Sequence, residues 1–238
     1  MREACIIVCS SATNIWLKIR FKSMNHLGGD RDPLNILGLI KNRRSVRDYK
    51  PREVPNKVLL EILEAARWAP SAHNAQPWRF IVVRDPHVKR KLAEAMATRW
   101  DKDLIKNGVP HENRESLLET SIRRFANAPI LIIACLTTED MDKYSDKRRR
   151  KIEYIMAVQS VAAAIENMLL AAHAYGLGSC WFCAPLFCQD AVQKVLKLPH
   201  HVEPQALVTL GHSDKRLEPP PRKFLQKIVF RDRWREVG

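Results

Sequence analysis

The chain has 238 residues, of which 46% are hydrophobic, and it carries a formal net charge of +14 at pH 7. This length and apolar content suffice for one folded domain with a buried core, which excludes a largely disordered chain. The basic residues are spread along the sequence apart from one run, 147–151, so the charge favours attraction of small anions over a groove for nucleic acid.

Cysteine usage indicates a reducing compartment. Six cysteines in 238 residues fall short of the density of a secreted disulfide scaffold, so we expect a cytoplasmic protein. Cys180, Cys183 and Cys188 have a C-x-x-C-x-x-x-x-C spacing, but zinc and iron–sulfur sites usually take four protein ligands. Bulky apolar residues separate these thiols, so we expect buried structural cysteines and no metal.

The first 32 residues are predicted to be an N-terminal extension, either disordered or the result of a misassigned start, with Met24 as the alternative start. The basic residues follow the apolar fragment 4–9 instead of preceding it, which is the wrong order for a secretory signal. Because the sequence shows no uninterrupted apolar run of about 18 residues, we expect no membrane span.

Apolar periodicity predicts alternating helices and buried strands along the rest of the chain. A helix capped by Asn56 is expected to end before Pro70, because a residue that precedes proline disfavours helix. The other predicted helices cover 34–40, 87–100, 112–125, 152–175 and 189–196, and the predicted strands cover 80–83, 130–136, 179–184 and 205–211. In the longest helix, Ile155 and Ile165 are expected on the buried face, with Gln159 partly buried beside it.

Two polar signatures bracket the helix that follows Asn56. The first, residues 43–47 (RRSVR), places three arginines and a serine within five positions. Guanidinium and hydroxyl groups bind phosphate oxygens through charge-assisted hydrogen bonds worth about 1.5–3 kcal/mol each. The second, residues 70–78 (PSAHNAQPW), offers amides that both donate and accept, as the edge of a flavin ring requires. Taken alone the second signature fits an ordinary turn, whereas the pair favours a cofactor site.

The two signatures and their spacing resemble the FMN-dependent nitroreductase family, over about residues 33–225. Within that family, residues 176–181 (GLGSCW) are most similar to the flavin-binding C-terminal domain of bifunctional coenzyme F420 glutamate ligases. The resemblance implies an α+β, three-layer fold with a mixed, mainly antiparallel central sheet flanked by helices. It also implies an intertwined homodimer in which residues 33–238 form one domain with a C-terminal dimer arm.

The resemblance also assigns the cofactor contacts. Residues 183 and 184 are expected to reach FMN through their main chain, and Arg222 with Lys223 to close the phosphate grip. Arg47 is the candidate cation that stabilises reduced flavin, and no side-chain nucleophile is expected. The implied FMN-binding residues are Arg43, Arg44, Ser45, Val46, Arg47, Ser71, Asn74, Gln76, Cys183, Ala184, Arg222 and Lys223.

The implied activity is ping-pong hydride transfer from NAD(P)H through N5 of tightly bound FMN to a small electron-poor acceptor, such as a nitro compound or a quinone. Reduced F420 is the other reductant that the resemblance permits. Two alternatives stay open. One is a flavin-binding reductase or accessory module that uses or modifies a deazaflavin, and the other is a basic nucleic-acid-binding protein without flavin.

Overall fold

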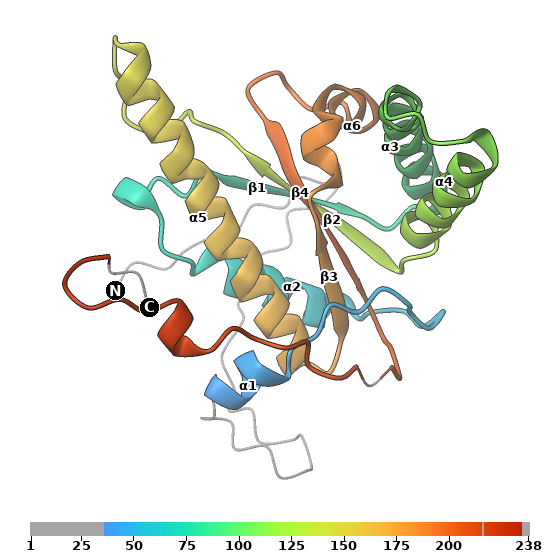
Figure 1. Cartoon of the computed structure of the whole chain (residues 1–238), viewed down its shortest axis with the longest axis horizontal. Helices are drawn as coiled ribbons and strands as arrows, with labels where there is room; N and C mark the ends of the chain where they lie inside the picture. Colours follow the sequence, from blue (N-terminus) through green and yellow to red (C-terminus); the bar gives the residue numbers. More distant parts are fainter. Residues whose placement is uncertain (1–35, 216, 235–238) are drawn as a thin grey trace, which may run out of the picture. The chain divides into compact units, whose positions relative to one another are not determined.

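The computed structural model describes residues 36–215 and 217–234 (Figure 1). The predicted N-terminal extension and the predicted start of the first helix at residue 34 lie outside these residues. The helices are α1 (Ile36–Asn42), α2 (Asn56–Arg67), α3 (Pro86–Lys106), α4 (His111–Ala126), α5 (Lys147–Ala174) and α6 (Gln189–Leu196), with short 3-10 turns η1 (Ala72–Asn74), η2 (Ala184–Phe187) and η3 (Leu225–Lys227).

A four-stranded sheet lies at the centre, in the order β1-β2-β4-β3. Its strands are β1 (Trp78–Val83), β2 (Ile130–Leu136), β3 (Gly178–Phe182) and β4 (Glu203–Gly211), and each neighbouring pair is antiparallel. An isolated parallel bridge joins Ser45 to Ser179 at the β3 edge. The mainly antiparallel sheet that the sequence predicts is therefore confirmed.

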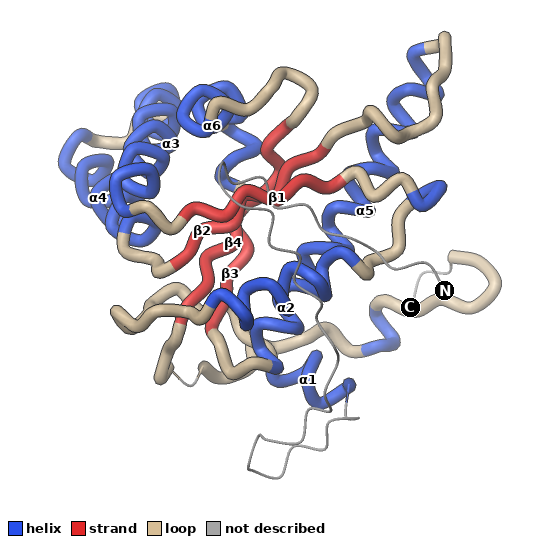
Figure 2. The backbone as a smooth tube through the Cα atoms, turned by 180° about the vertical axis from the view of Figure 1, so that it is seen from behind, coloured by secondary structure: helices blue, strands red, loops and turns tan. Residues whose placement is uncertain are grey.

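Helices cover both faces of the sheet, giving three layers (Figure 2). One apolar cluster joins α2 and α5 to the sheet through residues such as Ile62, Ile165 and Val208. A second cluster joins α3 and α6 to the opposite face through residues such as Leu92 and Val192. Because both faces are covered, β2 is buried along its whole length, as its unbroken apolar sequence predicts.

Two expectations for the longest helix, α5, need correction. It begins at Lys147 instead of residue 152, and Asp146 caps it by accepting a hydrogen bond from the Arg149 amide at 2.8 Å. Its buried face is also rotated in part from the predicted one: Ile165 is buried as expected, but Ile155 is 45% exposed and Gln159 is exposed. The face that packs on the sheet carries Ala157, Val161, Ala164, Ile165, Met168, Leu169 and Ala172. Small side chains let the helix approach the sheet closely, which the period of the pattern does not reveal.

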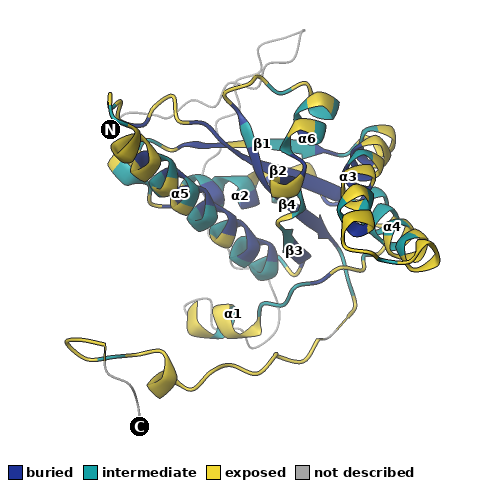
Figure 3. Ribbon diagram, turned by 45° about the horizontal axis from the view of Figure 1, so that its top comes forward, coloured by how far each residue is buried: buried dark blue, intermediate teal, exposed yellow. Residues whose placement is uncertain are grey.

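The same helix contains an 18-residue window with mean hydropathy 1.6, enough by length and composition to cross a membrane. The prediction from apolar runs alone found no such segment. However, the residues of α5 that face the sheet are buried in one of the two apolar clusters (Figure 3). The helix therefore has the packing of a core helix, which passes the same test of composition.

Two local predictions also need correction. Asn56 is the first residue of α2, and Pro55 holds the N-cap position with φ −59° and ψ 140°, without a side-chain cap. Strand β3 ends at Phe182, so Cys183 and Ala184 do not continue it but lead into the turn η2. The proline after Ala184 favours this turn, because its fixed φ and missing N–H do not suit a strand.

We expect Ile132→Ala to lower the free energy of unfolding by about 2–5 kcal/mol, because the side chain is fully buried in the central strand and its loss leaves a cavity. The control Leu117→Ala, on an exposed position of α4, should change it by less than about 0.5 kcal/mol. Urea denaturation of both variants measures the difference. Equal effects would contradict the burial described for β2.

Candidate functional site

The arginine segment, residues 43–47, lies along the free edge of β3. The amide of Val46 donates to the carbonyl oxygen of Ser179 at 2.9 Å, next to the bridge between Ser45 and Ser179. A Cβ atom at Gly178 would lie 2.8 Å from Cγ1 of Val46, closer than packed carbon atoms permit. Glycine at position 178 therefore allows the segment to reach the strand.

A tyrosine behind the segment holds it in place. The Tyr49 hydroxyl lies 2.5 Å from the Val46 carbonyl oxygen and 2.6 Å from Oγ1 of Thr209 on β4. Burial is the main cause that raises the pKa of this hydroxyl, so it stays protonated and able to donate at neutral pH. Sequence reasoning missed Tyr49, which follows the arginine signature by two positions.

The three arginines of the segment have different partners. Nε of Arg43 lies 3.9 Å from a carboxylate oxygen of Glu166 on α5. Arg44 donates through Nη1 to the carbonyl oxygens of Lys41 and Arg43, at 2.6 and 2.8 Å. Arg47 donates to the Ser45 carbonyl oxygen at 3.3 Å. Arginine has five N–H donors, so each guanidinium retains donors for a ligand.

Cationic groups gather over one face of β3. The guanidinium carbons of Arg47 and Arg124 lie 5.9 and 5.8 Å from the centre of the Phe182 ring. Among residues 36–215 and 217–234, no ion pair neutralises Arg47 or Arg124. The face therefore carries positive charge that protein carboxylates do not pair. Sequence reasoning missed Arg124, because only the fold brings α4 beside Phe182.

The thiol of Cys180 lies within this charged region. Burial raises its pKa, and this effect outweighs the lowering by Arg47, by a hydrogen bond with Ser45, and by Arg124 and Arg43. The neighbouring thiols differ: Cys188 is buried as expected, and burial raises its pKa to about 11, whereas the expectation of a buried Cys183 is wrong, since this free thiol is exposed. Cys188 is near the Ala184 carbonyl oxygen, with Sγ 3.2 Å from that atom.

The C-terminal segment begins beside the arginines. The amide of Lys50 donates to the His212 carbonyl oxygen at 2.8 Å, and Nζ of Lys215 lies 2.6 Å from Oδ2 of Asp48. Nε of Arg44 donates to the Leu217 carbonyl oxygen at 3.1 Å. Arg222 and Lys223 follow in an exposed extended stretch. The structure thus brings the start of the tail to Arg44, while Arg222 and Lys223 have no described contact with the segment.

The second signature forms a tight, strained loop. Oγ of Ser71 accepts from the Gln76 amide at 3.1 Å, and Nε2 of Gln76 lies 3.4 Å from the Asn74 carbonyl oxygen. His73, Asn74 and Gln76 all have positive φ, at 55°, 54° and 48°. Such backbone costs of order 1–3 kcal/mol per non-glycine residue and is concentrated at functional sites. Both amide side chains belong to exposed residues, so they are accessible to a ligand.

Within one chain the two signatures lie beside different parts of α5. Arg43 is next to Glu166, whereas the loop meets Glu153 and Ser160, since His73 Nε2 lies 3.5 Å from Glu153 and the Ala72 amide donates to Ser160 Oγ at 3.3 Å. At 1.5 Å rise per residue, Glu153 and Glu166 are about 20 Å apart along the helix axis. The described chain therefore does not gather all of the predicted contacts around one point.

Comparison with known proteins identifies the family of this chain. A profile described as "Nitroreductase family" matches residues 40–212. The chain is 31% identical over 200 residues to a protein of Methanothermobacter thermautotrophicus whose provisional name couples NADH dehydrogenase with NAD(P)H nitroreductase; the match covers 83% of this chain and 87% of the relative. It is 33% identical over 216 residues to an NADH dehydrogenase of Thermus thermophilus, covering 81% and 92%.

Solved structures agree with this match. A protein of Desulfovibrio desulfuricans, solved in complex with FMN, is 25% identical with TM-score 0.63, covering 84% of this chain and 98% of its own. A BluB-like flavoprotein of Clostridium difficile is 24% identical with TM-score 0.69, covering 83% and 98%, and supports the fold alone.

We expect alkylation to separate the cysteines by burial. At mildly alkaline pH, iodoacetamide should modify exposed Cys183 well before Cys135 or Cys188, because burial raises the pKa values of the latter two to about 12 and about 11. A raised pKa leaves little thiolate, which is the reactive form. Peptide mass mapping over time measures the order, and modification of Cys135 at the rate of Cys183 would contradict the described burial.

Proposed function

The chain belongs to the nitroreductase family and is an oxidoreductase, and we propose that it holds FMN tightly and passes electrons from NAD(P)H to a small electron-poor acceptor. The chemistry supplied by FMN is hydride transfer at N5, from NAD(P)H in one half-reaction and to a nitro compound, quinone or related acceptor in the other. One observation carries the proposal: on the segment fixed to the β3 edge, Arg44 and Arg47 have no carboxylate partner among the described residues.

The residues present fit the phosphate of FMN. Arg43, Arg44 and Ser45 lie in consecutive positions on the β3 edge, so their donors are held close together. Arg44 also donates to Leu217 at the start of the tail, five residues before Arg222. We therefore assign Arg222, with Lys223, to the same phosphate, because the exposed tail that carries them starts beside Arg44.

The flavin ring is assigned to the Phe182 side of β3. Arg47 is held near the Phe182 ring by its position on the segment. A cation at this place would stabilise the negative charge that arrives on the N1 and C2-carbonyl side of the flavin ring on reduction. The main chain of Cys183 and Ala184, at the turn out of β3, is assigned to the same ring. Val46 is assigned to the site as the residue that anchors the segment, because its side chain is buried and its amide and carbonyl are bound by Ser179 and Tyr49.

A homodimer completes the proposed site. Within one chain the loop contacts α5 from Glu153 to Ser160, whereas Arg43 lies beside Glu166, about 9–20 Å further along the helix axis. Apolar side chains are exposed on α1, on the outer face of α5 and on the tail, including Leu37, Ile155 and Phe224 (Figure 3). Such a surface favours a two-fold partner, and we propose that the loop of one protomer meets the arginines of the other, with the tail as the dimer arm.

A second candidate is a reductase or accessory module for a deazaflavin of the F420 type. It rests on residues 176–181. In this run Gly176 follows the end of α5 with positive φ, and Gly178 lacks the side chain that would prevent Val46 from packing beside β3. Steady-state oxidation of NADPH and NADH, compared with turnover of reduced F420, separates the two candidates. Faster bleaching of bound FMN by reduced F420 than by either NADH or NADPH would favour the second candidate.

The exposed basic run at the start of α5, residues 147–151, supports a nucleic-acid function only weakly, because its exposure is that of an ordinary solvated helix start. Purified protein that is colourless and remains so after FMN titration would favour this reading over both flavin candidates. The free, unbridged thiols of the described cysteines support our assignment to the cytoplasm.

We expect the double variant Arg43→Ala and Arg44→Ala to bind FMN at least about 100-fold more weakly, because two charge-assisted hydrogen bonds of about 1.5–3 kcal/mol each are lost. Fluorescence quenching on FMN titration measures the affinity. Arg52→Ala is the matched control, since it removes an exposed arginine nearby that is outside the signature. Unchanged affinity in the double variant would remove the phosphate assignment.

We expect mixed subunits to restore activity if the site spans two chains. The Arg43→Ala, Arg44→Ala variant and an Asn74→Ala, Gln76→Ala variant should each reduce acceptors poorly alone. After mixing, partial unfolding and reassembly, a heterodimer regains one intact site, which carries the arginines of one chain and the loop of the other. Activity that does not rise on mixing, although heterodimers form, would assign both signatures to a site within one chain.

A further inference from the structure

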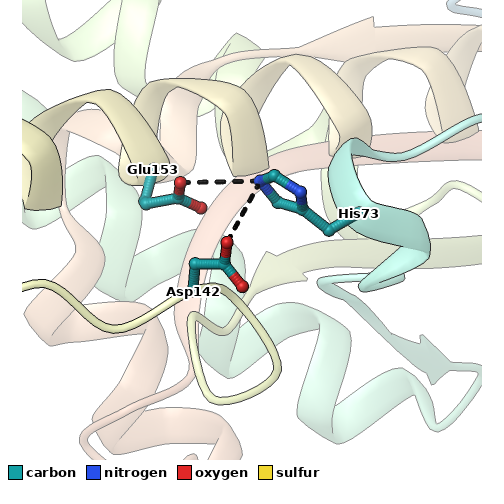
Figure 4. Close-up of side chains that lie close together, drawn as sticks. All are labelled: His73, Asp142 and Glu153. Carbon is teal, nitrogen blue, oxygen red and sulfur yellow. Dashed lines mark ion pairs between the residues drawn. The ribbon is translucent and has the colours of Figure 1, made fainter.

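A histidine and two carboxylates converge on the side of α5 that bears the strained loop (Figure 4). His73 comes from η1, Asp142 from the connection between β2 and α5, and Glu153 from α5 itself. Nε2 of His73 lies 3.5 Å from Oε1 of Glu153 and 3.9 Å from Oδ2 of Asp142. The three ligand atoms all lie within 4.8 Å of one another.

The buried carboxylate of this group is incompletely satisfied. The side chain of Glu153 is 7% exposed, and among the described residues its Oε2 has no hydrogen-bond partner. Figure 4 shows the carboxylate directed toward His73 and Asp142. A buried carboxylate oxygen without a donor is unfavourable and calls for a partner that the described residues of one chain do not supply.

The charge balance of the three side chains also favours a bound cation. Asp142 and Glu153 carry two negative charges, whereas one imidazole supplies at most one positive charge. Two cations near this connection are engaged elsewhere: Arg79 of β1 pairs with Asp140 at 3.3 Å, and Nζ of Lys143 donates to the Thr138 carbonyl oxygen at 2.6 Å. Among the described residues of one chain, no lysine or arginine pairs with Asp142 or Glu153.

The backbone around the cluster is held firmly. Met141, next to Asp142, is buried, and its amide donates to the Thr138 carbonyl oxygen at 3.2 Å. The amide of Thr137 donates to the Pro77 carbonyl oxygen at 2.8 Å, which ties this connection to the loop that carries His73. His73 keeps its strained positive φ of 55° in this arrangement. Ligand groups are thus presented together instead of being free to separate.

We propose that His73, Asp142 and Glu153 bind one divalent transition-metal ion, with zinc as the best match. Imidazole and carboxylate ligands suit zinc, and bonds of about 2.0–2.2 Å in a tetrahedron place neighbouring ligand atoms about 3.4 Å apart. The two spacings from His73 Nε2, 3.5 and 3.9 Å, are close to this value, and all three ligand atoms lie within 4.8 Å, so the widest separation closes by at most about 1.4 Å. Half-exposed His73 and Asp142 leave the remaining position open to water, and the ion joins the loop to α5.

The proposal does not depend on the flavin, and metal binding itself tests it. Holoprotein is treated with EDTA, desalted and titrated with zinc sulfate by isothermal titration calorimetry, with metal content measured by mass spectrometry. We expect one zinc ion per chain and a higher melting temperature in zinc. Glu153→Gln and His73→Ala should each weaken binding by at least about tenfold. Asp140→Asn, which changes a neighbouring carboxylate paired with Arg79, should bind zinc as the wild type does.

A separate control distinguishes loss of zinc binding from loss of folding. Without zinc, Glu153→Gln should melt at or above the wild-type temperature, because it removes a buried charge whose Oε2 has no described partner. If that variant does not fold, Asp142→Asn replaces it, since this side chain is 54% exposed and its isosteric change leaves packing intact. Wild-type protein that binds no zinc, or folded ligand variants that bind it as tightly as the wild type, would overturn the proposal.

Discussion

The pairing of residues 43–47 with the edge of β3 is the constraint on which the candidate site depends. One backbone hydrogen bond, from Val46 to Ser179, sets the register of the segment, and Gly178 allows the approach. Tyr49 secures the Val46 carbonyl from behind. Long cationic side chains lose much conformational entropy when a ligand immobilises them, so fixing their backbone beforehand lowers the cost of binding an anion.

Helix α5 divides the chemistry of the molecule into two regions. Near Glu166 it borders the arginines, and near Glu153 it borders the strained loop and the proposed metal ligands. Its inner face is built of small residues that pack on the sheet, while Ile155 on the outer face is left exposed. A helix that is apolar on two faces and charged at selected points is suited to serve both the core and an interface between subunits.

The sequence predicts the strands well because their apolar runs match burial on both faces of the sheet, as in β2. It also identifies the arginine segment, since three guanidiniums within five residues have few structural explanations. It places Ile165 of α5 correctly in the core but misplaces Ile155 and Gln159, because periodicity does not choose between two apolar faces. Arg124 and Glu153 escape notice for another reason: each acquires its partners only when elements distant in sequence pack together.

The central claim is that the arginine segment on β3 recognises a flavin through its phosphate. Riboflavin shares the ring and ribityl chain of FMN but lacks the phosphate, so comparing the two isolates that interaction. We expect FMN to bind at least about 100-fold more tightly than riboflavin, as the loss of two or more charge-assisted hydrogen bonds requires. Equal affinities for FMN and riboflavin, measured by titration of the flavin-free protein, would contradict the account.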